Sequence, residues 1–454
     1  MRGLGALILC LSLGACGTAE TTRLATPDIS LPPMKTFSTA APSAPVGSNA
    51  QIARDFLDLT FTLENGAKMP VFSRFEGPIT VSVTGTAPPS LSRDLDRLLS
   101  RFRGEANIPI RRVGPDQRAS ITIEPVPQAQ IQSVAPRAAC FVRPNVSGWD
   151  EYRARRNDRA TYWTRLTKRT RMAIFLPSDG SPQMIRDCLH EEISQALGPV
   201  NDLYRLTESV FNDDNFHTVL TGYDMLILRT FYDPALKTGM SESEVAARLP
   251  AVLNRLNPRG RSGGVAPQTP NLRSWKSEIT NARALRSTST RRLAAARRAA
   301  AIAENFGPSD PRRAFSYYIL GRASLTDAPE TALSAFLKAG RIYENRRDTS
   351  VQSAHVAMQV AAFQLSAGRA EVAISLVDQN LPTVKRSEHA ALLSLLLMVK
   401  AEALLLLDKS AESARVQNEA LAWARYGFGA DELVRERAAE ILAISPRSLE
   451  GGPA

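Results

Sequence analysis

The sequence predicts an α+β domain followed by an all-α domain of helical repeats. Two observations lead to this prediction: strand-like and helical segments alternate up to about residue 257, and strand signals disappear beyond residue 272, where only helical segments recur. The chain has 454 residues, of which 44% are hydrophobic, enough for two globular domains joined by tethers.

The N-terminus carries a mostly apolar run, Leu4 to Leu13, that leads into the motif Leu-Gly-Ala-Cys16. About ten apolar residues are too few to cross a hydrocarbon core of about 30 Å as a helix. We therefore expect residues 1–15 to be a lipoprotein signal peptide that is removed, with Cys16 as the lipidated first residue of the mature chain. An ordinary secretory signal cut near Ala15 is the alternative.

This motif resembles the signal of Gram-negative envelope lipoproteins, in which an Asp after the lipidated Cys favours retention in the inner membrane. Here Gly17 follows. The resemblance therefore implies the periplasmic leaflet of the outer membrane, with the lipid anchor as the membrane contact. Residues 16–50 contain five prolines among Thr, Ser and Ala, and we expect them to form a lipidated Pro-rich tether.

Residues 51–257 are predicted to form the α+β domain. Alternating apolar and polar residues, or short apolar runs, predict half-buried or buried strands. These strands are expected at residues 57–63, 78–83, 121–123 and 172–176.

Helical spacing of apolar residues and capping signals predict four helices in the same domain. The second begins at Ser181-Pro182, an N-cap followed by Pro, and ends at Gly198; the fourth opens with the capping box Ser241 and Glu244. Residues 149–163, with aromatic residues among arginines, receive no assignment. The helices are expected at residues 90–102, 182–198, 217–232 and 241–256.

The remainder of the chain divides into a linker, residues 258–272, a helical-repeat domain, residues 273–447, and a tail, residues 448–454. Helical segments of roughly 12 to 20 residues recur there, and the turns near Pro329, Gly368 and Asp408 are roughly forty residues apart, a period typical of stacked helix pairs. Further turns are expected at residues 307–308 and 381–382.

These segments resemble divergent tetratricopeptide-type repeats between residues 311 and 443, although another α-solenoid or a plain helical bundle remains open. Solenoids expose long concave surfaces, so we expect an envelope protein or peptide as partner. We expect the basic stretch Arg283 to Arg298 to be a solvated face of the protein. The alternative is that this stretch binds anionic lipid or glycan. The sequence contains no nucleotide loop or nucleic-acid module, and we expect neither a nucleic-acid partner nor a cofactor.

Cys140 and Cys188 are the only cysteines left once Cys10 is removed with the signal and Cys16 is acylated. In an oxidising periplasm two such thiols indicate one disulfide. Two buried free thiols are the alternative.

The helix expected at residues 182–198 holds the residues that could carry chemistry. A zinc helix of the type His-Glu-x-x-His needs imidazoles at positions i and i+4. Counting from His190, position 194 is Ser. Counting from Glu191, the ligand positions hold Glu191, Gln195 and Asn201, and Glu192 stands at the position of the general base. Neither register supplies a three-ligand zinc site, so we expect no bound metal.

The motif Glu191-Glu-x-x-Gln-Ala-Leu-Gly-x-x-Asn-Asp, followed by Ser209-Val-Phe-Asn-Asp and by the segment Tyr223 to Pro234, resembles the family known as domain of unknown function 2927. That family is similar to zincins with the imidazoles replaced. The resemblance covers residues 51–257 and implies a zincin-like fold, but no reaction, because the family has no established activity.

Glu192 lies on the apolar stripe of its helix, seven residues after Ile185 and three after Leu189. A buried carboxylate needs a partner. We therefore expect Glu192 to be a structural carboxylate bonded to an Arg or a turn amide; a catalytic base with a raised pKa is the alternative. The histidines at positions 190, 217, 355 and 389 are expected to be surface or packing residues, and Asp224 to be structural.

The first functional hypothesis is thus a non-catalytic periplasmic lipoprotein that acts as a protein-interaction or scaffold component of the envelope. The second is a metal-dependent hydrolase of envelope peptide or glycan, with Glu192 as general base. A purely structural tether is the third.

Overall fold

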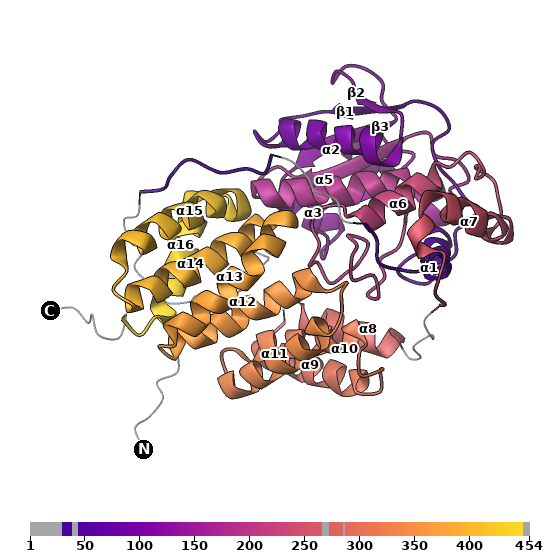
Figure 1. The fold of residues 1–454 in the computed structure, drawn as a ribbon. Coiled ribbons are helices and arrows are strands. Elements are labelled where there is room, and N and C mark those ends of the chain that lie inside the picture. Colours follow the sequence, from indigo (N-terminus) through magenta and orange to yellow (C-terminus); the bar gives the residue numbers. More distant parts are fainter. Residues whose placement is uncertain (1–29, 39–43, 266–271, 285–286, 448–454) are drawn as a thin grey trace. The chain divides into compact units, whose positions relative to one another are not determined.

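The computed structural model describes residues 30–38, 44–265, 272–284 and 287–447 (Figure 1). The predicted signal peptide, the predicted lipidation site Cys16 and the predicted tail lie outside the described residues. The chain divides into two compact units, residues 41–267 and residues 1–40 with 268–454. Within the described ranges, none of the helices is both long and apolar enough to span a bilayer.

The first unit contains a five-stranded sheet with the strand order β2-β1-β3-β5-β4. The first four strands in this order run parallel, and β4 pairs antiparallel with β5 at the edge. The expected strands at residues 78–83, 121–123 and 172–176 are confirmed, and β2 and β4 are additional. Because helices alternate with mostly parallel strands, the unit is α/β rather than α+β. The strands are β1 (Ile79–Val83), β2 (Ile110–Arg112), β3 (Ile121–Val126), β4 (Phe141–Pro144) and β5 (Met172–Pro177).

Strand β5 is covered on both faces, as is typical of a strand inside a parallel sheet. Ile174 belongs to the main apolar core, whereas its neighbour Phe175 belongs to a second cluster that includes Trp149 and Tyr152. Helix α5 packs on β5 from one face, and α3 packs on β5 from the other. The sheet therefore separates two apolar layers, and α5 lies in the larger one.

The helices of this unit begin largely where the capping signals place them. The capping box of Ser241 and Glu244 is present at the start of α7. Helix α6 is shorter than the predicted 217–232, because a second capping box, Thr221 with Asp224, starts it at Gly222. The helices are α1 (Asn49–Phe61), α2 (Leu91–Ala106), α3 (Gln128–Val134), α4 (Trp149–Arg155), α5 (Pro182–Leu197), α6 (Gly222–Phe231) and α7 (Glu242–Leu256).

The strand predicted at residues 57–63 is wrong, because α1 occupies residues 49–61. Ile52, Phe56 and Leu59 are fully buried at helical spacing, and Ser48 caps the helix by accepting from the N–H of Gln51. The local alternation of apolar and polar residues is therefore overridden by the longer helical pattern that begins upstream of it.

The second unit is all-helical in its described C-terminal part. Each helix contacts the next, and the alternate helices α12, α14 and α16 also contact one another, as expected for stacked antiparallel pairs. The helices are α8 (Leu272–Ala282), α9 (Ser289–Ala303), α10 (Pro311–Ser324), α11 (Pro329–Glu344), α12 (Ser350–Ser366), α13 (Ala370–Arg386), α14 (Ala390–Leu406), α15 (Ser410–Phe428) and α16 (Asp431–Ile444).

The predicted turns near residues 307, 328, 368 and 408 fall between helices, whereas the turn predicted at residues 381–382 is wrong. Pro382 lies inside α13, whose last turn is held by the fully buried Val384. Gly368 and Asp408 adopt positive φ values of 71° and 59°, which ends the helices before them. Proline alone is therefore a weaker stop signal here than a residue in the left-handed region.

Residues 30–38 belong to the same unit as the helices, although they fall within the predicted tether. They have no regular secondary structure, and Leu31 and Phe37 pack, half-buried, against the apolar core that contains Trp423. The apolar side chains of this segment are buried by packing against the helices of the second unit.

Candidate functional site

Helix α5 carries every residue of the predicted site except Asn201. Ser181 caps it by accepting from the N–H of Met184 at 3.1 Å, and Pro182 occupies its first turn. The helix ends at Gly198, where an added Cβ would lie 2.8 Å from the ring of Phe231. Only glycine allows the end of α5 to approach this ring so closely, which explains the Ala-Leu-Gly ending of the motif.

The C-terminal end of α5 is closed by a buried arginine. Arg169 donates to the carbonyl oxygens of Gln195 at 2.5 Å, Ala196 at 2.7 Å and Gly198 at 2.5 Å, and it stacks on the ring of Trp163. These carbonyls would otherwise be unpaired at a helix end. Burial lowers the pKa of Arg169 to about 10, so the guanidinium stays charged at neutral pH. The sequence analysis missed this residue.

Glu192 points into the protein interior and is bonded to the sheet. Its side chain accepts a hydrogen bond from the backbone N–H of Val142 on the edge strand β4, and the residue is only 3% exposed. The second carboxylate oxygen, Oε2, is buried without a hydrogen-bond partner among the described residues. Glu192 therefore joins α5 to an otherwise unpaired edge of the sheet, a role close to the structural one expected, with a strand amide in place of an Arg or turn amide.

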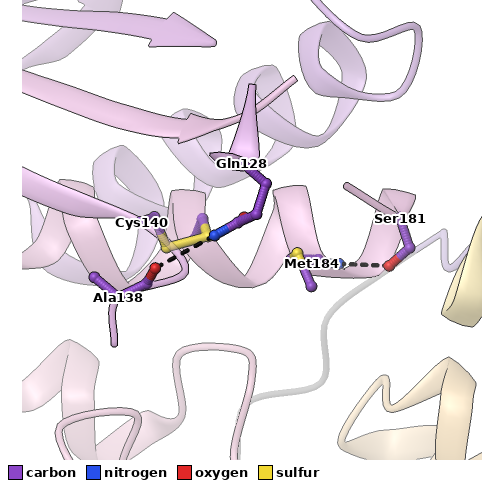
Figure 2. Close-up of a disulfide and its surroundings, with 6 residues drawn as sticks. Gln128, Ala138, Cys140, Ser181 and Met184 are labelled. Carbon is purple, nitrogen blue, oxygen red and sulfur yellow. Dashed lines mark hydrogen bonds between the residues drawn. A yellow bond between two sulfur atoms is a disulfide. The ribbon is translucent and has the colours of Figure 1, made fainter. Parts of the chain in front are cut away.

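Figure 2 shows the disulfide Cys140–Cys188, and the sulfur of Cys140 lies near the carboxylate of Glu192. The presence of the disulfide confirms the predicted pairing and links α5 to the residue before β4. The Sγ of Cys140 lies within 4.8 Å of carboxylate oxygens of both Glu191 and Glu192. The space next to the two carboxylates is therefore partly filled by sulfur.

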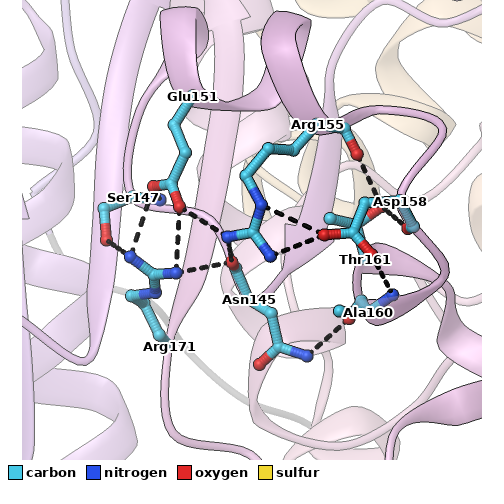
Figure 3. Close-up of polar contacts among 8 residues, drawn as sticks. All are labelled: Asn145, Ser147, Glu151, Arg155, Asp158, Ala160, Thr161 and Arg171. Carbon is cyan, nitrogen blue, oxygen red and sulfur yellow. Dashed lines mark hydrogen bonds and ion pairs between the residues drawn. The ribbon is translucent and has the colours of Figure 1, made fainter.

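The opposite end of β4 is fixed by a polar network (Figure 3). Glu151 accepts from Arg155 at 2.9 Å, from Arg171 at 3.0 Å and from the N–H of Ser147 at 2.8 Å. Arg171 also donates to the carbonyl oxygen of Asn145, the residue after β4, at 2.7 Å. Strand β4 is thus held at its first end by the disulfide and at its second end by this network, so its position over α5 is rigid.

The third predicted ligand position, Asn201, is engaged in hydrogen bonds to the backbone. Asn201 is buried; its Nδ2 donates to the carbonyl oxygen of Asp58 at 3.1 Å, and its Oδ1 accepts from the N–H of Asp202 at 3.0 Å. Gln195 is half-buried one turn after Glu191. Asn201 is therefore engaged in holding the loop after α5 against α1.

A group of acidic side chains surrounds Glu191 and Glu192. Burial and neighbouring negative charges raise the pKa values of Glu191, Glu192 and Asp202 well above their usual range. Glu64 and Asp213 contribute to this negative field. The sequence analysis did not identify Asp202 or Glu64 as part of the site; the only available signal was the position of Asp202 directly after the third pseudo-ligand.

The donor set does not fit a catalytic metal. Among the His, Cys, Asp and Glu side chains that the structure describes, the only group of three close ligand atoms belongs to Cys140, Glu191 and Glu192. The sulfur of Cys140 is in a disulfide and cannot act as a thiolate. Within this group two carboxylates remain, which is fewer than the three protein ligands of a catalytic zinc site and fewer than the six or more oxygen ligands typical of calcium.

The histidines have structural surroundings. His190 is buried, and its Nδ1 accepts from the N–H of Leu220 at 3.1 Å; burial and the nearby Arg101 lower its pKa well below the usual value. Burial also lowers the pKa of His217, to about 4. His355 and His389, which looked isolated in the sequence, have ring centroids 4.9 Å apart inside the helical unit. The histidines at positions 190 and 217 are thus neutral packing residues at physiological pH.

Comparison with known protein families finds a match for most of the first unit. No curated protein and no solved structure matches the chain. The family resemblance drawn from the motifs of α5 and α6 is confirmed: residues 49–251 match the family described as Protein of unknown function (DUF2927).

Proposed function

We propose that the protein is a lipoprotein anchored through Cys16 at the periplasmic face of a Gram-negative outer membrane. It acts there without catalysis, as a protein-interaction or scaffold component of the envelope. The motif that ends at Cys16 and the following Gly17 support the location. The disulfide Cys140–Cys188 supports an oxidising compartment, because structural disulfides are rare in the cytosol.

The structural engagement of Glu192 is the observation that carries the non-catalytic part of the proposal. A general base must reach a reacting water or substrate. Glu192 is instead buried and bonded to the N–H of Val142, and β4 is locked over it by the disulfide. We therefore propose that residues 51–257 form a zincin-like domain in which helix α5 has a structural role.

The alternative, a metal-dependent hydrolase, receives no support from the donor set. Among the described His, Cys, Asp and Glu side chains, the one group of three close ligand atoms includes the disulfide sulfur of Cys140, and Asn201 is already bonded to the backbone of Asp58. No reaction step can be written through these residues without further ligands.

The helical unit supplies the surface for partners. We propose that α8 to α16 form tetratricopeptide-like repeats, a class of array that binds proteins or peptides along an extended face. The stacking of alternate helices supports this assignment. Leu337 on α11 and Val372 on α13 are large apolar side chains that are 43% and 46% exposed, as expected of residues available to a partner.

Photo-crosslinking in the envelope tests the proposal. A photoreactive residue is placed at Leu337, at Val372 and at other exposed helical positions, with Tyr162 in the first unit as matched exposed control. We expect a discrete adduct with one envelope protein from the helical positions and none from Tyr162. Failure to obtain an adduct from any helical position would refute the scaffold role.

A further inference from the structure

Residues 30–38 lie against helix α15 as an extended peptide. The backbone N–H of Lys35 donates to the carbonyl oxygen of Ala422 at 3.1 Å, and Arg425 donates to the carbonyl oxygen of Pro32 at 3.0 Å. The segment therefore uses its main chain for recognition, which requires an extended conformation. Pro32 and the adjacent Pro33 favour that conformation before binding and so reduce the entropy lost on docking.

An aromatic anchor fixes the end of the segment. The ring of Phe37 stacks on Trp423 with ring centroids 4.4 Å apart and meets Tyr426 edge-on at 6.3 Å. Leu31 packs against the same core six residues earlier. Aromatic pairs of this geometry add to the stabilisation from apolar burial, so Phe37 is expected to be the main anchor.

A charged residue between the two apolar anchors sets the register. The Nζ of Lys35 lies 3.4 Å from a carboxylate oxygen of Glu419 and 5.9 Å from the ring of Trp423. Both charged side chains are partly exposed, so the pair contributes little stability, but it favours a cation at this position and disfavours an anion.

One polar group of the site stays unsatisfied while the segment is bound. The indole N–H of Trp423 is buried and has no acceptor among the described residues. A ligand that supplied an acceptor there would bind roughly 5- to 150-fold more tightly, since an unsatisfied buried donor is costly. The occupant supplied by the chain itself is therefore not the best ligand for this surface.

We propose that helix α15 carries a peptide-binding site for an extended segment of the pattern Leu-Pro-x-x-Lys-x-Phe, and that residues 31–37 occupy it in cis as a latch. The proposal rests on the scaffold function and names the partner chemistry: a proline-containing extended segment with a cation two residues before an aromatic ring. Docking of such a partner displaces the latch and frees the segment that precedes the first unit.

Because residues 31–37 are covalently joined to the site, they compete with an added peptide for it. A segment joined to its site by the chain has an effective concentration on the order of millimolar. If the isolated segment binds with a dissociation constant of about 10 μM, the latch weakens binding of an added peptide by roughly 100-fold.

The test uses the mature chain without its lipid and a fluorescent peptide of residues 30–38, followed by fluorescence anisotropy. The Phe37→Ala chain, whose latch lacks its anchor, is expected to bind the labelled peptide at least tenfold more tightly than the native chain. Met34→Ala, at a position that is 39% exposed and makes none of the contacts described above, is the matched control and should bind like the native chain.

Charge reversal tests the register. A peptide with Lys35→Glu should bind the Phe37→Ala chain roughly two- to fivefold more weakly than the unmodified peptide, and it should regain this affinity when Glu419→Lys is added to that chain. The proposal is overturned if the native and Phe37→Ala chains bind the peptide equally, or if the reversed pair shows no rescue.

These outcomes separate the latch from the scaffold role. Envelope crosslinks from the helical unit without peptide binding would refute the latch alone. Peptide binding to the Phe37→Ala chain without any envelope adduct would refute the scaffold role alone.

Discussion

Substitution of Glu192 by glutamine removes the titratable group of this residue and keeps its shape nearly unchanged. Glutamine keeps an oxygen that can accept from the N–H of Val142, and it replaces the unpartnered Oε2 with an NH₂ group that faces a negative environment including Asp202. If Glu192 is structural, the substitution removes the free-energy cost of keeping a proton on this buried group as pH rises, and it preserves the bond to β4.

The expected change in the free energy of unfolding follows from the raised pKa of Glu192. Burial and the nearby Asp202 raise the pKa of Glu192 well above its ordinary value of 4.5. The folded chain then keeps a proton that the unfolded chain releases, so the free energy of unfolding falls as pH rises above 4.5. Each pH unit over which this holds corresponds to about 1.4 kcal/mol. Glutamine does not titrate, so Glu192→Gln should gain about 1–3 kcal/mol relative to the native chain between about pH 4 and pH 7.

Urea unfolding of both chains at about pH 4 and pH 7 measures this difference. Glu192→Ala is the control: it leaves the N–H of Val142 without its acceptor and should lose about 1–3 kcal/mol at about pH 4. This loss should shrink toward pH 7, because alanine, like glutamine, does not titrate. The reasoning is refuted if Glu192→Gln changes the free energy of unfolding equally at the two pH values, or if it destabilises the chain more at pH 7.

Two further substitutions test the packing. Replacing Cys140 and Cys188 by serine opens a loop with a sequence separation of 48, and we expect the free energy of unfolding to fall by about 4 kcal/mol; an unchanged urea midpoint would contradict this. Gly427→Ala places a Cβ 2.7 Å from backbone atoms of Ala391 and should cost about 1–3 kcal/mol by forcing α14 and α15 apart. Gly307→Ala, which meets nothing within 4 Å, is its control and should leave the melting temperature nearly unchanged, so equal shifts for the two alanine variants would show that the predicted clash is relieved elsewhere.

Much of the fold near α5 could be predicted because its signals are local. Ser181 and Pro182 mark the start of the helix and Gly198 marks its end, and each signal acts within one turn of the residue that carries it. The capping box of Ser241 is equally local. These elements were therefore predicted to within a residue.

The elements that were missed depend on contacts between distant segments. Strand β4 has four residues and becomes a strand only by pairing with β5, for example Val142 with Ile174. The role of Arg169 depends on its position next to the end of α5, and no periodic pattern in the sequence predicts that position. Such features require the tertiary structure, because the sequence around them has no pattern of its own.

The helix that carries Glu191, Glu192 and Gln195 was predicted, but the surroundings of these residues were not. The sequence placed Glu191, Glu192 and Gln195 on one helix, and the structure agrees. It could not indicate that the disulfide would lie beside the carboxylates, or that Phe37 would pack on Trp423 from nearly 400 residues away.

The most direct test of the central claim is the zinc content of the purified mature chain after equilibration with zinc and dialysis, measured by elemental analysis on the native and Glu191→Gln proteins. The structural assignment of the α5 carboxylates predicts no stoichiometric zinc in either protein. One zinc per native chain that is lost in Glu191→Gln would contradict it.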